Sequence, residues 1–167
     1  MPRSVDLLME SPASVEQVHS AFSEHEYWLA RLAAFGGSTT LDSLAVAADG
    51  TVTVATTQDL RHELLPGMLA KFYTNDMKIL RSETWKPVGA SQVRGQVSVR
   101  ASGAPGSGRG TALLESRPDG SQLTFTATVE VKIPLVGGRI ESWIAGQLTE
   151  EIPAIQRFTT DWITEHA

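Results

Sequence analysis

The sequence contains no cysteine. Disulfide bonds, thiolate metal sites and cysteine nucleophiles are therefore excluded, and the composition agrees with a reducing compartment. Basic residues are few as well: 14 Lys and Arg stand against 19 Asp and Glu, which gives a formal net charge of -5. No run of Lys or Arg could neutralise a row of phosphates, so we do not expect nucleic acid as a partner.

Long hydrophobic runs are also missing. No uninterrupted apolar stretch reaches the roughly 18 residues of a membrane helix, and Asp6 and Glu10 interrupt the segment where a signal peptide would need an apolar core. We therefore expect a cytoplasmic protein without integral membrane association, either a monomer or a weak homodimer. A chain of 167 residues can bury one sizeable core, so a single domain over residues 1–167 is expected.

Motifs for metals, nucleotides and hydrolysis are absent. The sequence has no GxSxG elbow, so a serine nucleophile is not visible, and the catalytic residues stay unknown. The glycine-rich segment GAPGSGRG (residues 103–110) lacks the Lys and Ser or Thr of a phosphate loop, and we interpret it as a flexible hairpin loop. We expect no cofactor and no metal, since the four histidines have no tight ligand spacing: His19, His25, His62 and His166.

Helix signals occur near both ends of the chain. Ser14 with Gln17 forms a capping-box start, and a second short helix over about residues 26–34 would bury Trp28, Leu29 and Leu32. Apolar residues spaced by three and four predict a long helix from about Arg139 to Glu165, bent at Pro153.

Between these helices the sequence alternates as strands do, and SVDLLME (residues 4–10) forms another strand before them. Asp49-Gly50 predicts a tight hairpin turn within residues 41–60. The remaining expected strands cover residues 77–85, 92–101, 110–116 and 123–133. Hairpin-linked strands make an antiparallel sheet whose apolar face needs a cover, and only the C-terminal helix is long enough to supply one.

The order of these elements, the SPASVEQV helix start, Trp85-Lys86-Pro87 at a strand end and VEVKIPLVGGRIESWI (residues 129–144) resemble the START-like (SRPBCC, helix-grip) superfamily. This superfamily includes the birch pollen allergen, lipid-transfer domains and polyketide cyclases. Within it, the chain is most similar to an uncharacterised actinobacterial family. The resemblance covers nearly the whole chain and implies an α+β helix-grip fold. In this fold, a curved antiparallel sheet of about seven strands (strand, two helices, six strands, helix) wraps around a long C-terminal helix, with a hydrophobic ligand cavity between them.

Several residues expected to point inward are small, and they either leave room for a ligand or let the helix pack closely: Ala45, Ala47, Ala55, Gly95, Ala112 and Ala127. In the strand at residues 77–85, Ile79, Arg81, Glu83 and Trp85 share one face. If that face lines the cavity, Arg81 and Glu83 are buried charges that could orient a polar ligand head or perform acid-base work. Otherwise the face is partly solvated and the charges pair with neighbours in the sheet.

The segment from Arg61 to Asp76 carries polar His62 and Tyr73 among apolar residues, and it is either a lid over the cavity or a connection packed on the core. Trp143 either lines the cavity mouth or belongs to the core. The candidate ligand-binding residues are Arg81, Glu83, Trp85, His62, Tyr73, Phe125, Val129, Trp143, Ile144 and Leu148.

The favoured hypothesis is a protein that binds a small hydrophobic or amphipathic ligand, lipid or polyketide-like, without catalysis. One alternative is a cyclase, aromatase or dehydratase that uses the same cavity and needs two convergent ionisable groups. A second alternative is a co-chaperone-like interaction module, which needs a continuous exposed apolar surface.

Overall fold

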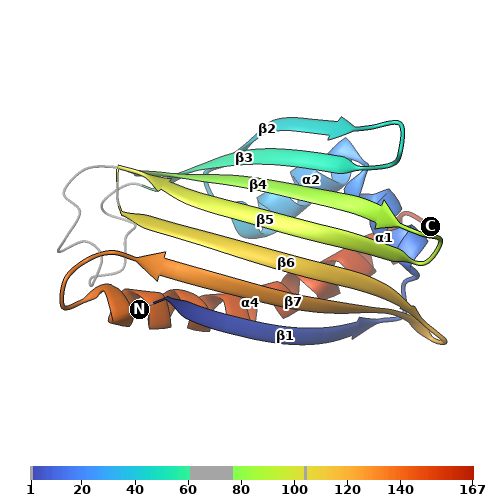
Figure 1. The fold of residues 1–167 in the computed structure, drawn as a ribbon. Helices are drawn as coiled ribbons and strands as arrows, with labels where there is room; N and C mark the ends of the chain where they lie inside the picture. The colour runs from blue at the N-terminus through green and yellow to red at the C-terminus, as the bar shows by residue number, and fades with distance from the viewer. Residues whose placement is uncertain (1, 61–76, 104) are drawn as a thin grey trace.

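The computed structural model of the chain describes residues 2–60, 77–103 and 105–167 (Figure 1). Short helices follow the first strand, six further strands come next, and one long helix ends the chain. The elements are β1 (Arg3–Ser11), α1 (Val15–Phe22), α2 (His25–Arg31), the π-helical turn η1 (Leu32–Gly36), β2 (Thr39–Val46), β3 (Val52–Leu60), β4 (Met77–Val88), β5 (Gln92–Ser102), β6 (Gly106–Arg117), β7 (Gly120–Val131) and α4 (Gly137–Glu165).

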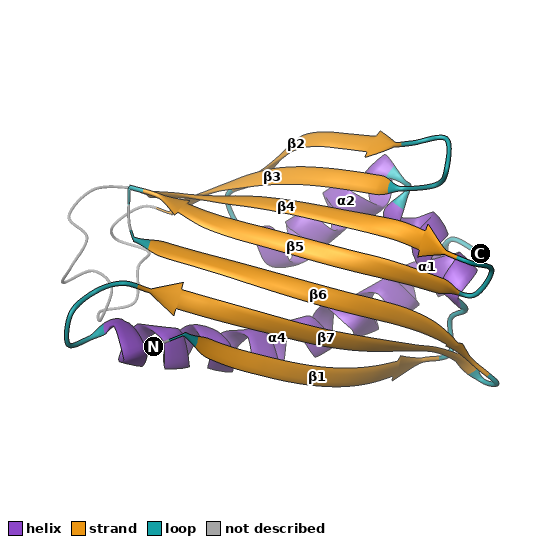
Figure 2. Ribbon diagram, in the orientation of Figure 1, coloured by secondary structure: helices purple, strands orange, loops and turns teal. Residues whose placement is uncertain are grey.

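The strands form one curved sheet in the order β1-β7-β6-β5-β4-β3-β2, with every neighbouring pair antiparallel. The helices all lie on the same side of this sheet (Figure 2). Strand β1 forms one edge of the sheet. It comes from the N-terminal end of the sequence and pairs with β7, the last strand of the chain. The α+β helix-grip fold predicted from the sequence is confirmed.

The predicted capping box starts α1. The Ser14 hydroxyl accepts a hydrogen bond from the Gln17 backbone at 3.1 Å, and the Gln17 side chain accepts one from the Ser14 backbone at 2.9 Å. In α2, Tyr27 and Trp28 are buried, whereas Leu29 is 48% exposed, so its predicted burial is wrong. Tyr27 and Arg31 occupy the inward positions four residues apart, which turns Leu29 toward solvent.

Strand β6 begins at Gly106, so the interpretation of residues 103–110 as a flexible loop is wrong for Gly106 to Gly110. Glycine has a low strand propensity, but this segment is hydrogen-bonded to β5 on one side and to β7 on the other. Gly106, Gly108 and Gly110 alternate with the exposed Ser107 and Arg109, which puts these glycines on the inner face.

The inner face is less open than its small residues suggest. Ala45 and Ala47 are exposed, so their predicted inward position is wrong, and the register of β2 shifts between Leu41 and Ser43. Ala55 is also misassigned, because it lies between the buried Val54 and Thr56 and therefore on the outer face. Three of the small residues are buried as predicted: Gly95, Ala112 and Ala127.

Helix α4 packs chiefly on β1 and β7 and begins two residues before the predicted start at Arg139. Its first inward residue, Ile140, joins an apolar cluster with Met77, Val129 and Val131. A larger cluster around Trp28, Phe22 and Trp85 fills the other end of the interior. None of the described helices combines the length and apolar character that crossing a bilayer requires.

The fit of Trp85 over Gly95 gives a test of the packing. A Cβ atom added at Gly95 would lie 2.5 Å from the Trp85 ring, whereas one at Gly108 would meet its nearest neighbour at 3.7 Å. We expect Gly95→Ala to lower the free energy of unfolding by about 1–3 kcal/mol. The control, Gly108→Ala, should change it by less than about 0.5 kcal/mol. Urea denaturation measures the free energy of unfolding of both variants, provided that the dependence on urea concentration has the same slope in each. Equal urea midpoints for the two variants would contradict this packing.

Candidate functional site

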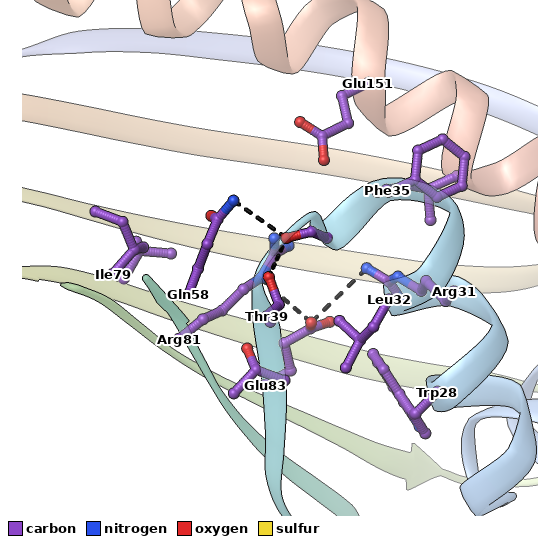
Figure 3. Close-up of a pocket in the computed structure, with 14 residues that line it drawn as sticks. Trp28, Arg31, Leu32, Phe35, Thr39, Gln58, Ile79, Arg81, Glu83 and Glu151 are labelled. Carbon is purple, nitrogen blue, oxygen red and sulfur yellow. Dashed lines mark hydrogen bonds and ion pairs between the residues drawn. The ribbon is translucent and has the colours of Figure 1, made fainter. Parts of the chain in front are cut away.

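A cavity of about 100 Å³ opens on the inner face of the sheet, where β3, β4 and β5 face α2 and η1 (Figure 3). Its polar side is formed by Arg31, Arg81 and Glu83, with Gln58 and Glu151 nearby. Apolar side chains from five elements form the remaining wall: Trp28, Leu32, Phe35, Ile79, Val99 and Ile155. The cavity therefore joins a charged corner to a hydrophobic surface.

Glu83 lies at the centre of the charged corner and is 3% exposed. Alternation along β4 puts Arg81, Glu83 and Trp85 on the inner face, as the sequence indicates. Glu83 Oε2 lies 3.3 Å from Arg81 Nε and 3.7 Å from Arg31 Nη2, and Trp85 Nε1 donates to Oε1 at 3.3 Å. Figure 3 shows both arginines converging on this carboxylate. Arg81 pairs with Glu83 inside the sheet and is 28% exposed, as one alternative from the sequence expects, whereas the second cation, Arg31, comes from α2.

Arg31 is the last residue of α2, and it is 7% exposed. Its guanidinium lies 4.6 Å from the centre of the Trp28 ring, a cation–π contact that covers one side of the charge. Burial by itself lowers the pKa of Arg31, but the Glu83 carboxylate and Tyr27 outweigh it and raise the pKa above its usual value. Arg31 is therefore a permanent cation.

Glu83 is held in its charged form. Burial by itself raises the pKa of Glu83, but Arg31, Arg81 and the hydrogen bond from Trp85 outweigh that effect and lower the pKa below its usual value. Glu83 is therefore ionised at neutral pH, and its proton affinity is too low for it to act as a general acid there.

The turn η1 closes the cavity at the end of α2. The Gly36 carbonyl accepts hydrogen bonds from Gln58 Nε2 at 3.2 Å and from the Thr39 hydroxyl, which ties the turn to β3 and β2. Gly37 follows with φ 56°, a left-handed conformation that glycine adopts without strain. π-helical turns are frequent at functional sites, and this one presents Leu32 and Phe35 to the cavity.

The comparisons with known proteins agree with this architecture. The family model described as "Protein of unknown function (DUF2505)" matches residues 6–163. The chain belongs to this family. Uncharacterized protein Rv0481c of Mycobacterium tuberculosis is 39% identical over 173 residues, which cover 99% of each chain. The similarity to an uncharacterised actinobacterial family that the sequence predicts is thereby confirmed.

Solved structures of other proteins have the same fold. TTHA0849 from Thermus thermophilus superimposes with a TM-score of 0.59 at 14% identity, over 100% of this chain and 99% of that one. A START superfamily protein from Mycobacterium smegmatis superimposes with a TM-score of 0.53 at 14% identity, over 98% and 99%. At these identities the likeness establishes the fold, and it confirms the START-like resemblance found in the sequence.

The ligand-binding residues predicted from the sequence lie in different environments in the structure. Arg81 and Glu83 line the cavity, and Trp85 lies behind Glu83 as its hydrogen-bond donor. Phe125 and Val129 are buried in the two apolar clusters. Their part in ligand binding stays a prediction.

Helix α4 supplies three more of the candidates. Ile144 and Leu148 are half-buried beside the apolar clusters. Trp143 is 38% exposed, so the alternative that it is a core residue is wrong. His62, Tyr73 and the expected lid lie outside the described residues.

Sequence reasoning missed Arg31 as a partner of Glu83. The signal was present, because Arg31 follows Trp28 by three residues and so shares its helix face. It also missed Gln58 and Glu151, whose sequence neighbourhoods carry no distinguishing pattern. In the part of the chain that the structure describes, no cluster of three or more His, Asp or Glu side chains could hold a metal ion.

Replacing Glu83 tests the buried ion pair. Glu83→Gln leaves Arg31 buried without its anion, and we expect the free energy of unfolding at pH 7 to fall by about 3–5 kcal/mol. The folded pKa of Glu83 lies below its unfolded value of about 4.3, so its charge stabilises the fold above that value. This stabilisation disappears as the pH falls through the folded pKa. The difference in the free energy of unfolding between wild type and variant should therefore narrow below about pH 4.

The control for this experiment is Glu130→Gln, since Glu130 pairs at 3.5 Å with Lys132 on the surface. It should change the free energy of unfolding by less than about 1 kcal/mol. Denaturant titrations between pH 3 and 7 measure both variants. A Glu83→Gln loss that stays constant with pH would show that the carboxylate charge is not what stabilises the fold.

Proposed function

We propose that the protein binds a small hydrophobic or amphipathic molecule on the concave face of the sheet, with the polar end of the ligand in the cavity. The observation that carries the proposal is the buried ion cluster at Glu83, which opens onto a cavity that apolar side chains from five elements also line. Ligand sites in proteins combine an apolar lining with a few convergent polar groups, and this arrangement fits that pattern. The START-like fold supports the same proposal.

The size of the cavity limits which part of a ligand it takes. A volume of about 100 Å³ is well below the roughly 300–1,000 Å³ of sites for drug-sized ligands, so it suits a head group. An apolar tail would continue along the inner face past Val99, which is paired in register with Gly108 of β6. Gly108 has no side chain to fill the space there, and each tail methylene buried would contribute about 0.8 kcal/mol.

Acid-base catalysis is less well supported than binding. The described cluster does bring ionisable groups together, as the enzyme alternative requires. The pKa of Arg31 is raised, however, and the pKa of Glu83 is lowered away from neutrality. A general acid or base works best with a pKa near the operating pH, so this cluster favours holding a ligand over transferring a proton.

The interaction-module alternative has little support from the described surface. The large exposed apolar side chains belong to separate elements along the chain, as Leu8 of β1, Leu29 of α2 and Val46 of β2 illustrate. Single exposed apolar residues are ordinary on protein surfaces. The single domain, the cytoplasmic location and the monomeric or weakly dimeric state stay predictions.

Obstructing the cavity tests the proposal. Val99 lines it, whereas Ser98 precedes Val99 on β5 and points to the outer face. We expect native mass spectrometry of protein purified from its own host to show a small-molecule adduct that lipid extraction recovers. The adduct should be lost in Val99→Phe, which fills the cavity, and kept in Ser98→Phe.

The same variants separate obstruction from unfolding. Both should keep the thermal midpoint of the wild type within a few degrees, since both positions are at least partly exposed. Two simple amphipathic probes, the fatty acid decanoate and the alcohol decanol, complete the test. The proposal would be overturned if the wild-type protein carried no adduct and bound neither probe.

A further inference from the structure

We propose that the head group taken by this cavity is a carboxylate, and that Arg81 is the residue that binds it. This inference rests on the proposed function and assigns the chemical class of its ligand. It follows from an excess of hydrogen-bond donors over acceptors around Glu83.

Glu83 has no free oxygen to offer a ligand. Oε2 lies against both Arg31 and Arg81, and Oε1 accepts from Trp85. An amine or other cationic head group would have to compete with two arginines for these atoms. The cluster is therefore poorly suited to a cation.

The arginines, in contrast, have donors to spare. Each guanidinium has five N–H groups, far more than one carboxylate accepts. Arg81 Nε lies 3.3 Å from Glu83 Oε2 but makes no hydrogen bond, and no other acidic residue of the described chain lies within ion-pair distance of Arg81. No described residue forms a hydrogen bond with the terminal nitrogens of Arg81, so these nitrogens can bind an acceptor on a ligand.

Arg81 is also the more accessible of the two arginines. Its side chain is 28% exposed and lines the cavity, whereas that of Arg31 is 9% exposed and lies against the Trp28 ring. Arg31 therefore positions Glu83, and Arg81 faces the ligand. An arginine fork binds the two oxygens of a carboxylate in parallel, which suits a planar head group.

The charge balance disfavours a doubly charged ligand. Within the buried cluster Arg31 and Arg81 exceed Glu83 by one positive charge, but Glu151 brings the whole charged lining of the cavity to neutrality. A single carboxylate at Arg81 therefore fits better than a doubly charged phosphate monoester. Glu151 of α4 lines the cavity opposite the cluster and is half-exposed (Figure 3). Its carboxylate repels an anion, so the affinity for a carboxylate ligand should rise when Glu151 is neutralised.

The test compares decanoate with decanol, which share an apolar chain and differ in head group, by isothermal titration calorimetry near pH 7.5. Wild-type protein should bind decanoate about ten- to a hundredfold more tightly than decanol. Arg81→Gln should reduce decanoate binding to the level of decanol. Arg81→Lys, which keeps the charge but loses the fork, should leave an intermediate preference.

Two further variants complete the experiment. Arg100→Gln is the matched control, since Arg100 is exposed on the outer face of the adjacent strand, in register with Leu80. It should leave both affinities unchanged. Glu151→Gln should tighten decanoate binding about two- to tenfold and leave decanol unaffected.

The outcomes separate the two proposals. If decanol binds as tightly as decanoate, or if folded Arg81→Gln and Arg81→Lys both keep the full preference, the carboxylate inference is overturned and the proposed function stands. Should Arg81→Gln fail to fold, Arg81→Lys and Glu151→Gln still decide, and the inference is overturned if neither changes the preference. If neither compound binds the wild type, the carboxylate inference is overturned, and the proposed function is overturned with it when the purified protein also carries no adduct.

Discussion

The burial of one carboxylate constrains the rest of this structure. Glu83 is 3% exposed in the middle of β4, and a charge in that position is strongly destabilising unless cations and donors surround it. Strand neighbours supply Arg81 and Trp85, but the remaining cation has to come from the layer above. Helix α2 therefore ends with Arg31 over Glu83, and this contact ties the end of α2 to β4.

The position of the cavity follows from how the rest of the interior is filled. Two of the small residues on β5 and β6 leave no hole, because aromatic rings from adjacent strands cover them: Trp85 lies over Gly95 and Phe125 over Gly110. Aromatic rings can cover glycines in this way where the inner face of the sheet is apolar. Beside Glu83 and the two arginines, apolar side chains would desolvate the charges further, and there the turn η1 arches over a space instead.

Local patterns were sufficient to predict what depends on neighbours in sequence. Alternation identified the inner face of β4, and the spacing of Ser14 and Gln17 identified the start of α1. Pairing between distant segments was not predictable in this way. The glycines of β6 form a strand only because β5 and β7 lie on both sides, and Arg31 meets Glu83 from a segment far away in the sequence. The register shift in β2 likewise inverted the facing expected for Ala45.

Under the proposed function, the charged cluster serves ligand binding more than stability. Replacing a buried ion pair with well-packed apolar residues is often neutral or stabilising, so a cluster of this kind adds little to a fold that already has a large aromatic core. The pKa of Arg31 is raised and that of Glu83 is lowered, so this pair stays charged at neutral pH. What the cluster does provide is a preorganised guanidinium, held by Glu83 at the wall of a cavity that apolar side chains also line. Preorganisation of this kind lowers the entropic cost of binding a charged head group, which is the property that a ligand-binding protein requires.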